Sequence, residues 1–185
     1  MNLVVDDLPL MLNELRQAWQ HPVRVSLGAN ARRAIAESNE VVAEVVIDDA
    51  RRSIELVPEE SVDVVVGDAF TGLTVPWHLT TVEFVEKIAA RLSPGGIYTV
   101  NVIDRAELRF ARAEAATMSE VFENVALFAP PGHLAGAQGG NFVLAGSDQP
   151  IDVKRVEEAI SSRGGVEIGV TADELARFVA GSRPL

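Results

Sequence analysis

The stretch SVDVVVGDAF, residues 61–70, decides the fold class of this chain. It contains a run of valines that ends at an acidic residue, Asp68. A continuous apolar run of this kind predicts a strand that is buried on both faces, as in a parallel sheet. In open parallel sheets, ligands bind just beyond the carboxyl ends of the strands. Asp68 is therefore the first candidate for a functional residue.

The composition excludes several classes of protein. The chain has 185 residues, of which 48% are hydrophobic and 23% charged, and this predicts one globular domain over residues 1–185. A net charge of -11 disfavours a nucleic-acid partner. The absence of cysteine excludes disulfides, zinc–thiolate sites and thiol nucleophiles. Because the sequence shows neither a membrane span nor a secretory signal, we expect a cytoplasmic protein without a membrane partner.

Apolar strand patterns alternate with amphipathic helix patterns along the chain. This alternation predicts an α/β fold, a Rossmann-like, mostly parallel sheet with helices on both faces. Segments 125–129 and 141–145 have no helix between them, so we expect a C-terminal antiparallel strand pair. A flexible, glycine-rich loop is predicted at residues 132–140. The strands are expected at residues 2–5, 23–27, 41–47, 62–66, 97–103, 125–129, 141–145 and 166–170. A helix with a clean apolar stripe is expected at residues 8–19.

Acidic residues follow several of the predicted strands. They are Asp6 and Asp7, Asp48 and Asp49, Asp68, and Asp104. Such carboxylates can accept hydrogen bonds from ribose hydroxyls, an adenine amino group or a substrate amine. Aspartate is also favoured at helix starts, and Asp49 could cap a helix that begins at Ala50. Both interpretations, ligand binding and capping, stay open for each acid.

Several common site motifs are missing. There is no Gly-x-Gly-x-x-Gly after a first strand and no Walker loop. The histidines, His21, His78 and His133, do not have metal-ligand spacing, so no metal site is predicted. His78 lies in the loop after Asp68 and could line a pocket there. A loop histidine that has no catalytic role fits the pattern as well.

Four further motifs carry a resemblance to a known family. They are DAFTG at residues 68–72, VPWHLTTVEF at 75–84, LSPGGIY at 92–98 and NVID at 101–104. With them, the chain resembles the spermidine synthase-like branch (polyamine aminopropyltransferases) of the class I S-adenosylmethionine-dependent methyltransferase fold. The resemblance covers residues 43–147 best. The segment DAFTG with the following PWHLTTVEF is the part most specific to the synthase-like branch.

The resemblance implies a set of site residues. Asp68 would be the catalytic residue that binds and deprotonates the attacking amine of putrescine. Asp49, with the adjacent Ala50, would contact the adenine of the donor, and Asp6 or Asp7 would hold its ribose hydroxyls. Two positions in the loop after Asp68 are substrate-binding candidates: Thr71, where the family has a second aspartate, and His78.

The resemblance also implies the reaction. We expect transfer of an aminopropyl group from decarboxylated S-adenosylmethionine to a polyamine such as putrescine, with no tightly bound cofactor and no metal. The Gly-rich loop after the family's first strand has no counterpart here, and the match begins at the second strand. Two alternatives therefore stay open: methyl transfer from S-adenosylmethionine on the same fold, and a non-catalytic interaction domain. An exposed sheet edge would favour a homodimer.

Overall fold

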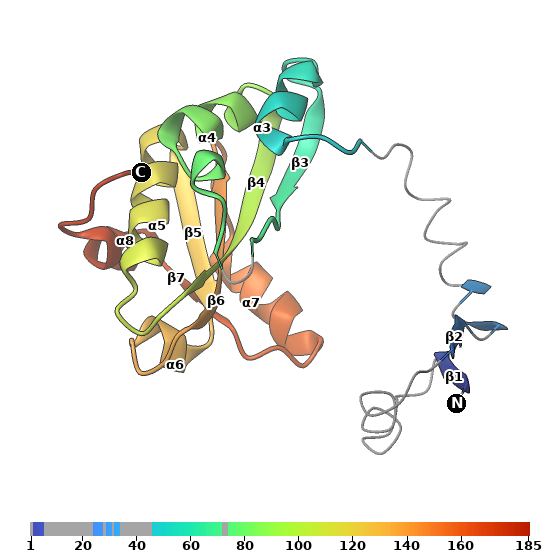
Figure 1. Ribbon diagram of the computed structural model, residues 1–185. Coiled ribbons are helices and arrows are strands. Elements are labelled where there is room, and N and C mark those ends of the chain that lie inside the picture. The colour runs from blue at the N-terminus through green and yellow to red at the C-terminus, as the bar shows by residue number, and fades with distance from the viewer. Residues whose placement is uncertain (1, 6–23, 28, 31, 34–45, 72–73) are drawn as a thin grey trace. The chain divides into compact units, whose positions relative to one another are not determined.

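The computed structural model describes residues 1–185 except 1, 6–23, 28, 31, 34–45 and 72–73, and it divides the chain into two units, Met1–Ile47 and Asp48–Leu185. In the first unit, β1 (Asn2–Val5) and β2 (Arg24–Leu27) pair in parallel (Figure 1). Both strands were predicted. The helix predicted at 8–19 and the candidate acids Asp6 and Asp7 lie outside the described residues.

The second unit is built on a five-stranded sheet with the order β3-β4-β6-β5-β7 (Figure 1). β3 pairs with β4 in parallel, and the other three pairings are antiparallel. The predicted Rossmann-like α/β class is confirmed, with a mixed sheet. The predicted antiparallel pairing of β5 with β6 is also confirmed. The strands are β3 (Val62–Gly67), β4 (Leu92–Asp104), β5 (Asn124–Ala129), β6 (Gly140–Ser147) and β7 (Ile168–Val170).

The helices cover the two faces of this sheet unequally. The main core lies between the sheet and α4 (Val82–Ala89), α5 (Arg109–Val121) and α8 (Ala172–Val179). On the opposite face, α7 (Val153–Ser162) packs over a smaller apolar cluster. Four short helices complete the unit: α3 (Ala50–Ser53), η1 (Ile54–Leu56), η2 (Trp77–Leu79) and α6 (Pro131–Leu134). No described helix has the length and apolar composition needed to cross a membrane.

β4 begins at Leu92 rather than at Ile97, where the sequence pattern placed its start. The glycines that end the preceding helix are part of the strand, and Gly95 has a φ of +83°, which L side chains rarely adopt. The register between β3 and β4 shifts at this point, between Val62 and Val64. The Pro-Gly-Gly segment therefore forms an irregular entry to the strand, and it keeps the later residues of β4 in parallel register with β3.

The prediction that β3 is buried on both faces is wrong for residues 48–185. Val64 and Val66 are 55% and 70% exposed. The reason is that β3 is the edge strand of this sheet, and α7 packs farther along the same face, against Ile97 and Phe128. The exposed valines therefore leave one face of the sheet open beside Asp68.

Glu114 on α5 is an ionisable side chain in the main core. It is fully buried, and neither carboxylate oxygen has a hydrogen-bond partner among the described residues. Burial raises the pKa of Glu114 to about 8, because the charged form would lose its hydration. In the unfolded chain the same carboxyl has its ordinary pKa of 4.5.

We predict that Glu114→Gln makes the protein more stable at neutral pH. The folded state keeps this proton up to a higher pH than the unfolded state does. The stability of the native protein therefore falls as pH rises from 4.5 toward 8. At pH 7 the substitution should add about 3 kcal/mol to the free energy of unfolding, at roughly 1.36 kcal/mol per pKa unit. Urea unfolding between pH 5 and 8 measures this. The exposed Glu120 on the same helix gives the control Glu120→Gln, and parallel pH profiles for native protein and Glu114→Gln would refute the assignment.

Candidate functional site

Asp68 lies at the carboxyl end of β3, beside Asn101 of β4. The parallel register pairs Gly67 with Val100, so the next residues on the two strands are neighbours. The Nδ2 of Asn101 donates a hydrogen bond of 3.0 Å to Oδ1 of Asp68. The amide therefore orients the carboxylate and leaves Oδ2 without a contact among the described residues. Strand alternation places the two side chains on the open face of the sheet, with Val66 and Thr99.

A pocket of about 830 Å³ opens on this face. Its polar lining residues are Asp68, Thr99, Asn101, His133, Asn141 and Glu167. Its apolar lining comes from the strands, from α7 and from the segment before α7, and includes Ile97, Phe128, Val143, Ile151, Val156 and Ile160. A pocket of this size with mostly apolar walls and a few polar groups is typical of small-molecule sites. Asp68 thus lines a pocket on this face of the sheet.

His133 lines the same pocket from α6. The sequence pattern placed it in a flexible loop, whereas the structure places it on the short helix that follows β5. Its ring lies 5.8 Å from that of Phe142, and its Nδ1 is 3.4 Å from the carbonyl oxygen of Asn141. A Cβ at Gly140 would collide with the imidazole, so the glycine allows this close approach. His133 is therefore held at the pocket wall by contacts from β6.

The charges around the pocket are of one sign. Asp68 and Glu167 are carboxylates, and no lysine or arginine is among the described residues that line it. Such a lining favours a cationic ligand with an apolar portion. The described residues contain no group of three or more metal-ligating side chains.

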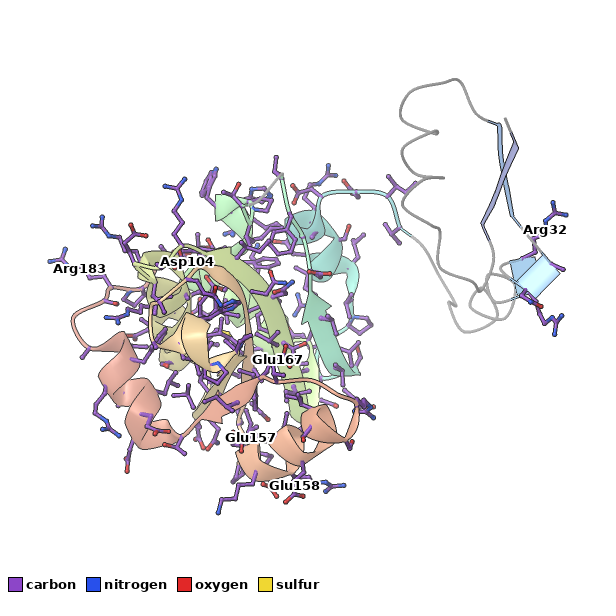
Figure 2. The ribbon with its side chains drawn as sticks, turned by 90° about the horizontal axis from the view of Figure 1, so that it is seen from below. Arg32, Asp104, Glu157, Glu158, Glu167 and Arg183 are labelled. Atoms are coloured by element: carbon purple, nitrogen blue, oxygen red, sulfur yellow. The ribbon has the colours of Figure 1, made fainter. Side chains whose placement is uncertain are left out.

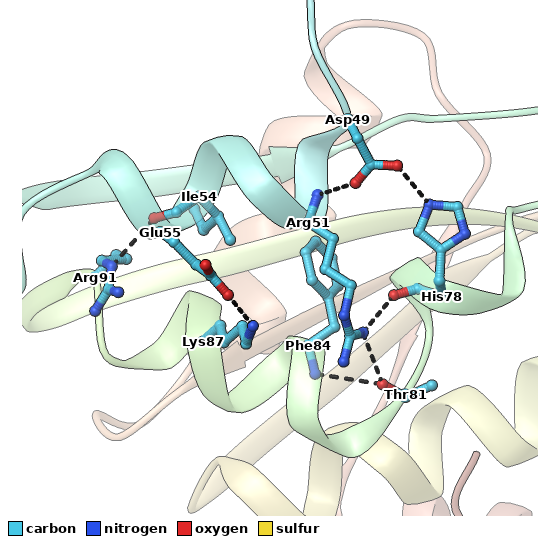
Figure 3. Close-up of polar contacts among 9 residues, drawn as sticks. All are labelled: Asp49, Arg51, Ile54, Glu55, His78, Thr81, Phe84, Lys87 and Arg91. Carbon is cyan, nitrogen blue, oxygen red and sulfur yellow. Dashed lines mark hydrogen bonds and ion pairs between the residues drawn. The ribbon is translucent and has the colours of Figure 1, made fainter.

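Asp49 belongs to a second cluster, between α3 and η2 (Figure 3). Its Oδ1 accepts a hydrogen bond of 2.8 Å from the backbone of Arg51, which confirms the predicted helix cap. Its Oδ2 lies 3.2 Å from Nε2 of His78. The guanidinium of Arg51 donates to the carbonyl of His78 at 2.6 Å and to Oγ1 of Thr81 at 3.2 Å. This network joins the start of α3 to the start of α4.

The structure therefore separates the site residues predicted from the sequence. It brings Asp49, Ala50 and His78 together around the start of α3, while Asp68 lines the pocket. Thr71 forms a backbone bridge with Thr74, and neither Thr71 nor His78 is among the described residues that line the pocket.

Asp104, the acid after β4, has a capping role. Its Oδ1 accepts from the backbone N–H of Arg105, and its Oδ2 from that of Ala111 in the first turn of α5. Of the two interpretations open for this acid, the structure supports helix capping.

Five polar residues of the pocket were not predicted as site residues: Thr99, Asn101, His133, Asn141 and Glu167. A signal was present in β4, where Thr99 and Asn101 alternate with Tyr98, Val100 and Val102. Strict alternation means that the polar residues face one side of the sheet and the apolar residues the other. Glu167 gave no such signal, because its place in the pocket depends on the pairing of β7 with β5.

The structure is similar to those of spermidine synthases. A probable spermidine synthase from Corynebacterium glutamicum matches with a TM-score of 0.72 and 28% identity, over 100% of this chain and 72% of that one. Spermidine synthase from Thermotoga maritima matches with a TM-score of 0.52 and 15% sequence identity, over 96% of this chain and 67% of that one. A spermidine synthase in complex with the transition-state analogue AdoDATO matches with a TM-score of 0.53 and 14% sequence identity, over 96% of this chain and 68% of that one. No family model matches the sequence, and no match was found among curated proteins.

Fold and site together define an α/β protein of the Rossmann-like class, with a pocket on the face of its sheet that Asp68 and Asn101 line. Within this class, the chain has a spermidine synthase-like fold. The likeness confirms the resemblance that was predicted from residues 68–104.

The network around Arg51 predicts a difference between two adjacent arginines. Arg51→Ala should lower the free energy of unfolding by about 1–3 kcal/mol, because two partly buried hydrogen bonds from a charged group are lost. Arg52→Ala should change it by less than about 0.5 kcal/mol, since among the described residues the side chain of Arg52 makes only an exposed ion pair, with Asp48. Urea unfolding of both variants is the measurement. Equal effects of the two substitutions would contradict the structural role of Arg51.

Proposed function

We propose that the chain is an aminopropyltransferase-like enzyme that binds its acceptor amine at Asp68. The observation that carries this proposal is the oriented carboxylate of Asp68 at the wall of the apolar pocket, with no described lysine or arginine beside it. A carboxylate in this setting attracts an ammonium group, and the apolar walls accommodate a methylene chain. The spermidine synthase-like fold supports the assignment.

The chemistry requires that the amine first lose a proton, because an ammonium has no lone pair for attack. Asp68 is in a position to hold the ammonium and to accept this proton, directly or through water. The free amine would then attack the aminopropyl carbon of the donor sulfonium. The new C–N bond forms as the C–S bond breaks, and the sulfur leaves as a neutral thioether. Asn101 contributes by fixing one oxygen of the carboxylate, so that the other is directed to the substrate.

The donor we propose is decarboxylated S-adenosylmethionine, used as a co-substrate. The similar spermidine synthase whose structure contains AdoDATO supports a donor of this type. Asp49 and Ala50 are the described residues proposed for its adenine, and Asp6 or Asp7 is proposed for its ribose. Because both oxygens of Asp49 already have contacts, a donor would share this carboxylate with Arg51 and His78.

We predict that Asp68→Asn lowers the rate of aminopropyl transfer to putrescine by about 100-fold or more, because the proton acceptor is lost. Product formation with decarboxylated S-adenosylmethionine, followed by mass spectrometry, measures this. The matched control is Asp63→Asn on the same strand, an exposed residue that contacts Ser93 and does not line the pocket. Retained turnover in Asp68→Asn would remove Asp68 from the proposed role.

Calorimetric titration with both donors separates the alternatives. Tighter binding of decarboxylated S-adenosylmethionine than of S-adenosylmethionine supports aminopropyl transfer, and the reverse preference supports methyl transfer on the same fold. If neither donor binds at millimolar concentration, both enzymatic assignments fail and an interaction domain is the better description.

A further inference from the structure

Tyr98 of β4 fills the space beneath the residue that precedes Asp68. In the parallel register, Val65 pairs with Tyr98 and Gly67 with Val100. The Tyr98 side chain lies in the main core, where the residue is only 1% exposed. A Cβ at Gly67 would lie 2.9 Å from the Tyr98 hydroxyl oxygen, so the hydroxyl occupies the place of a side chain at this position. The backbone directly before Asp68 therefore packs on Tyr98.

Glu114 of α5 is the charged neighbour of this tyrosine. Burial raises the pKa of the Tyr98 hydroxyl, and the Glu114 carboxylate raises it further, so the two groups interact through the core. Both carboxylate oxygens of Glu114 are buried without a hydrogen-bond partner among the described residues. A buried acid without a partner thus faces the side chain that packs under the backbone of the site.

The other titratable groups around α5 are directed elsewhere. β5 and β6 contain none, and on β4 the only one besides Tyr98 is Asp104, which caps the start of α5. The charged residues of α4, α5 and α8 are exposed or contact other groups; they are Glu83, Glu86, Lys87, Arg109, Arg112, Glu120, Asp173, Glu174 and Arg177. The glutamates labelled in Figure 2 lie on the opposite face of the sheet, with α7; they are Glu157, Glu158 and Glu167.

Ionisation of Glu114 creates a demand for a hydrogen-bond donor, because a buried charge without one is strongly unfavourable. Among the buried hydroxyls, those of Thr80, Thr117 and Ser147 already donate to backbone carbonyl oxygens. The Tyr98 hydroxyl makes no hydrogen bond with another described residue. It is therefore the buried hydroxyl that remains available to the carboxylate of Glu114.

We propose that Tyr98 positions Asp68, and that it does so only while Glu114 is protonated. With the proton in place, the hydroxyl stays under Gly67, and Asp68 keeps its hydrogen bond of 3.0 Å from Asn101. When Glu114 gives its proton to the solvent, the hydroxyl turns toward the carboxylate, and the backbone at Gly67 loses its packing partner. The inference concerns the shape of the site and does not depend on which molecule the pocket binds.

Nuclear magnetic resonance of the full chain between pH 5 and 9 tests this. The chain has a single tyrosine, so ¹³C-tyrosine labelling follows Tyr98 alone, while ¹⁵N labelling follows the side-chain amide of Asn101. In the native protein both signals should shift together in one transition near pH 8, where Glu114 ionises. Glu114→Gln should lose this transition from both signals. The control Glu120→Gln, at an exposed position of the same helix, should retain it.

Two further comparisons isolate the role of each residue. Any shift of Asn101 that arises from His133 at the pocket wall remains in Glu114→Gln, so the difference from the native protein reports Glu114. Tyr98→Phe keeps the ring and removes only the hydroxyl, and it should abolish the transition at Asn101. Its stability should still fall as pH rises, because Glu114 remains buried. Circular dichroism across the pH range checks that each protein is folded.

The outcomes that overturn the inference are distinct. A transition at Asn101 that persists in Glu114→Gln would show that another group causes it. One that persists in Tyr98→Phe would show that Tyr98 does not position the site. A transition of Tyr98 that leaves Asn101 unchanged in the native protein would limit the tyrosine to packing in the core. The proposed function is tested separately, by Asp68→Asn, and none of these results decides it.

Discussion

The parallel pairing of β3 with β4 is the constraint on which the site depends. It places the residues that follow Gly67 and Val100 side by side, so that Asp68 and Asn101 meet at the sheet edge. The irregular entry at Gly95 sets the register of this pairing. A change of one residue in the register would turn the polar side chains of β4 into the main core. The orientation of the carboxylate therefore follows from backbone geometry.

The unequal covering of the sheet turns this edge into a pocket. One face is closed by α4, α5 and α8, while α7 covers only part of the other, and the open part extends from the exposed Val64 and Val66 to α7. The side chains that face this opening are acidic or neutral, and none of the described lining residues is a lysine or arginine. The tightly packed face holds the strands in place, and the open face carries the candidate site. The closed face also contains Glu114, whose buried carboxyl has no hydrogen-bond partner among the described residues. Its burial lowers the free energy of unfolding at neutral pH.

Much of the fold could be predicted from the sequence, because strand and helix periodicity is local. The valines of β3, the stripe of α4 and the antiparallel pair β5–β6 all follow from short patterns. Of the residues that line the pocket, only Asp68 was predicted, because an acid that directly follows a strand is a local signal. His133 and Glu167 could not be placed, because their positions depend on contacts between segments far apart in the chain. The burial of β3 was predicted wrongly, since composition does not show which strand lies at an edge.

The central claim is that an amine binds beside Asp68, and nuclear magnetic resonance tests it most directly. Putrescine is titrated into ¹⁵N-labelled protein, and the side-chain amide of Asn101 is followed with the backbone amides. We expect saturable shifts at Asn101, Thr99 and Val143, with no comparable change around Pro94 and Gly95 at the opposite end of β4. Unshifted signals of Asn101 at saturating amine, or shifts confined to residues away from the pocket, would contradict the claim.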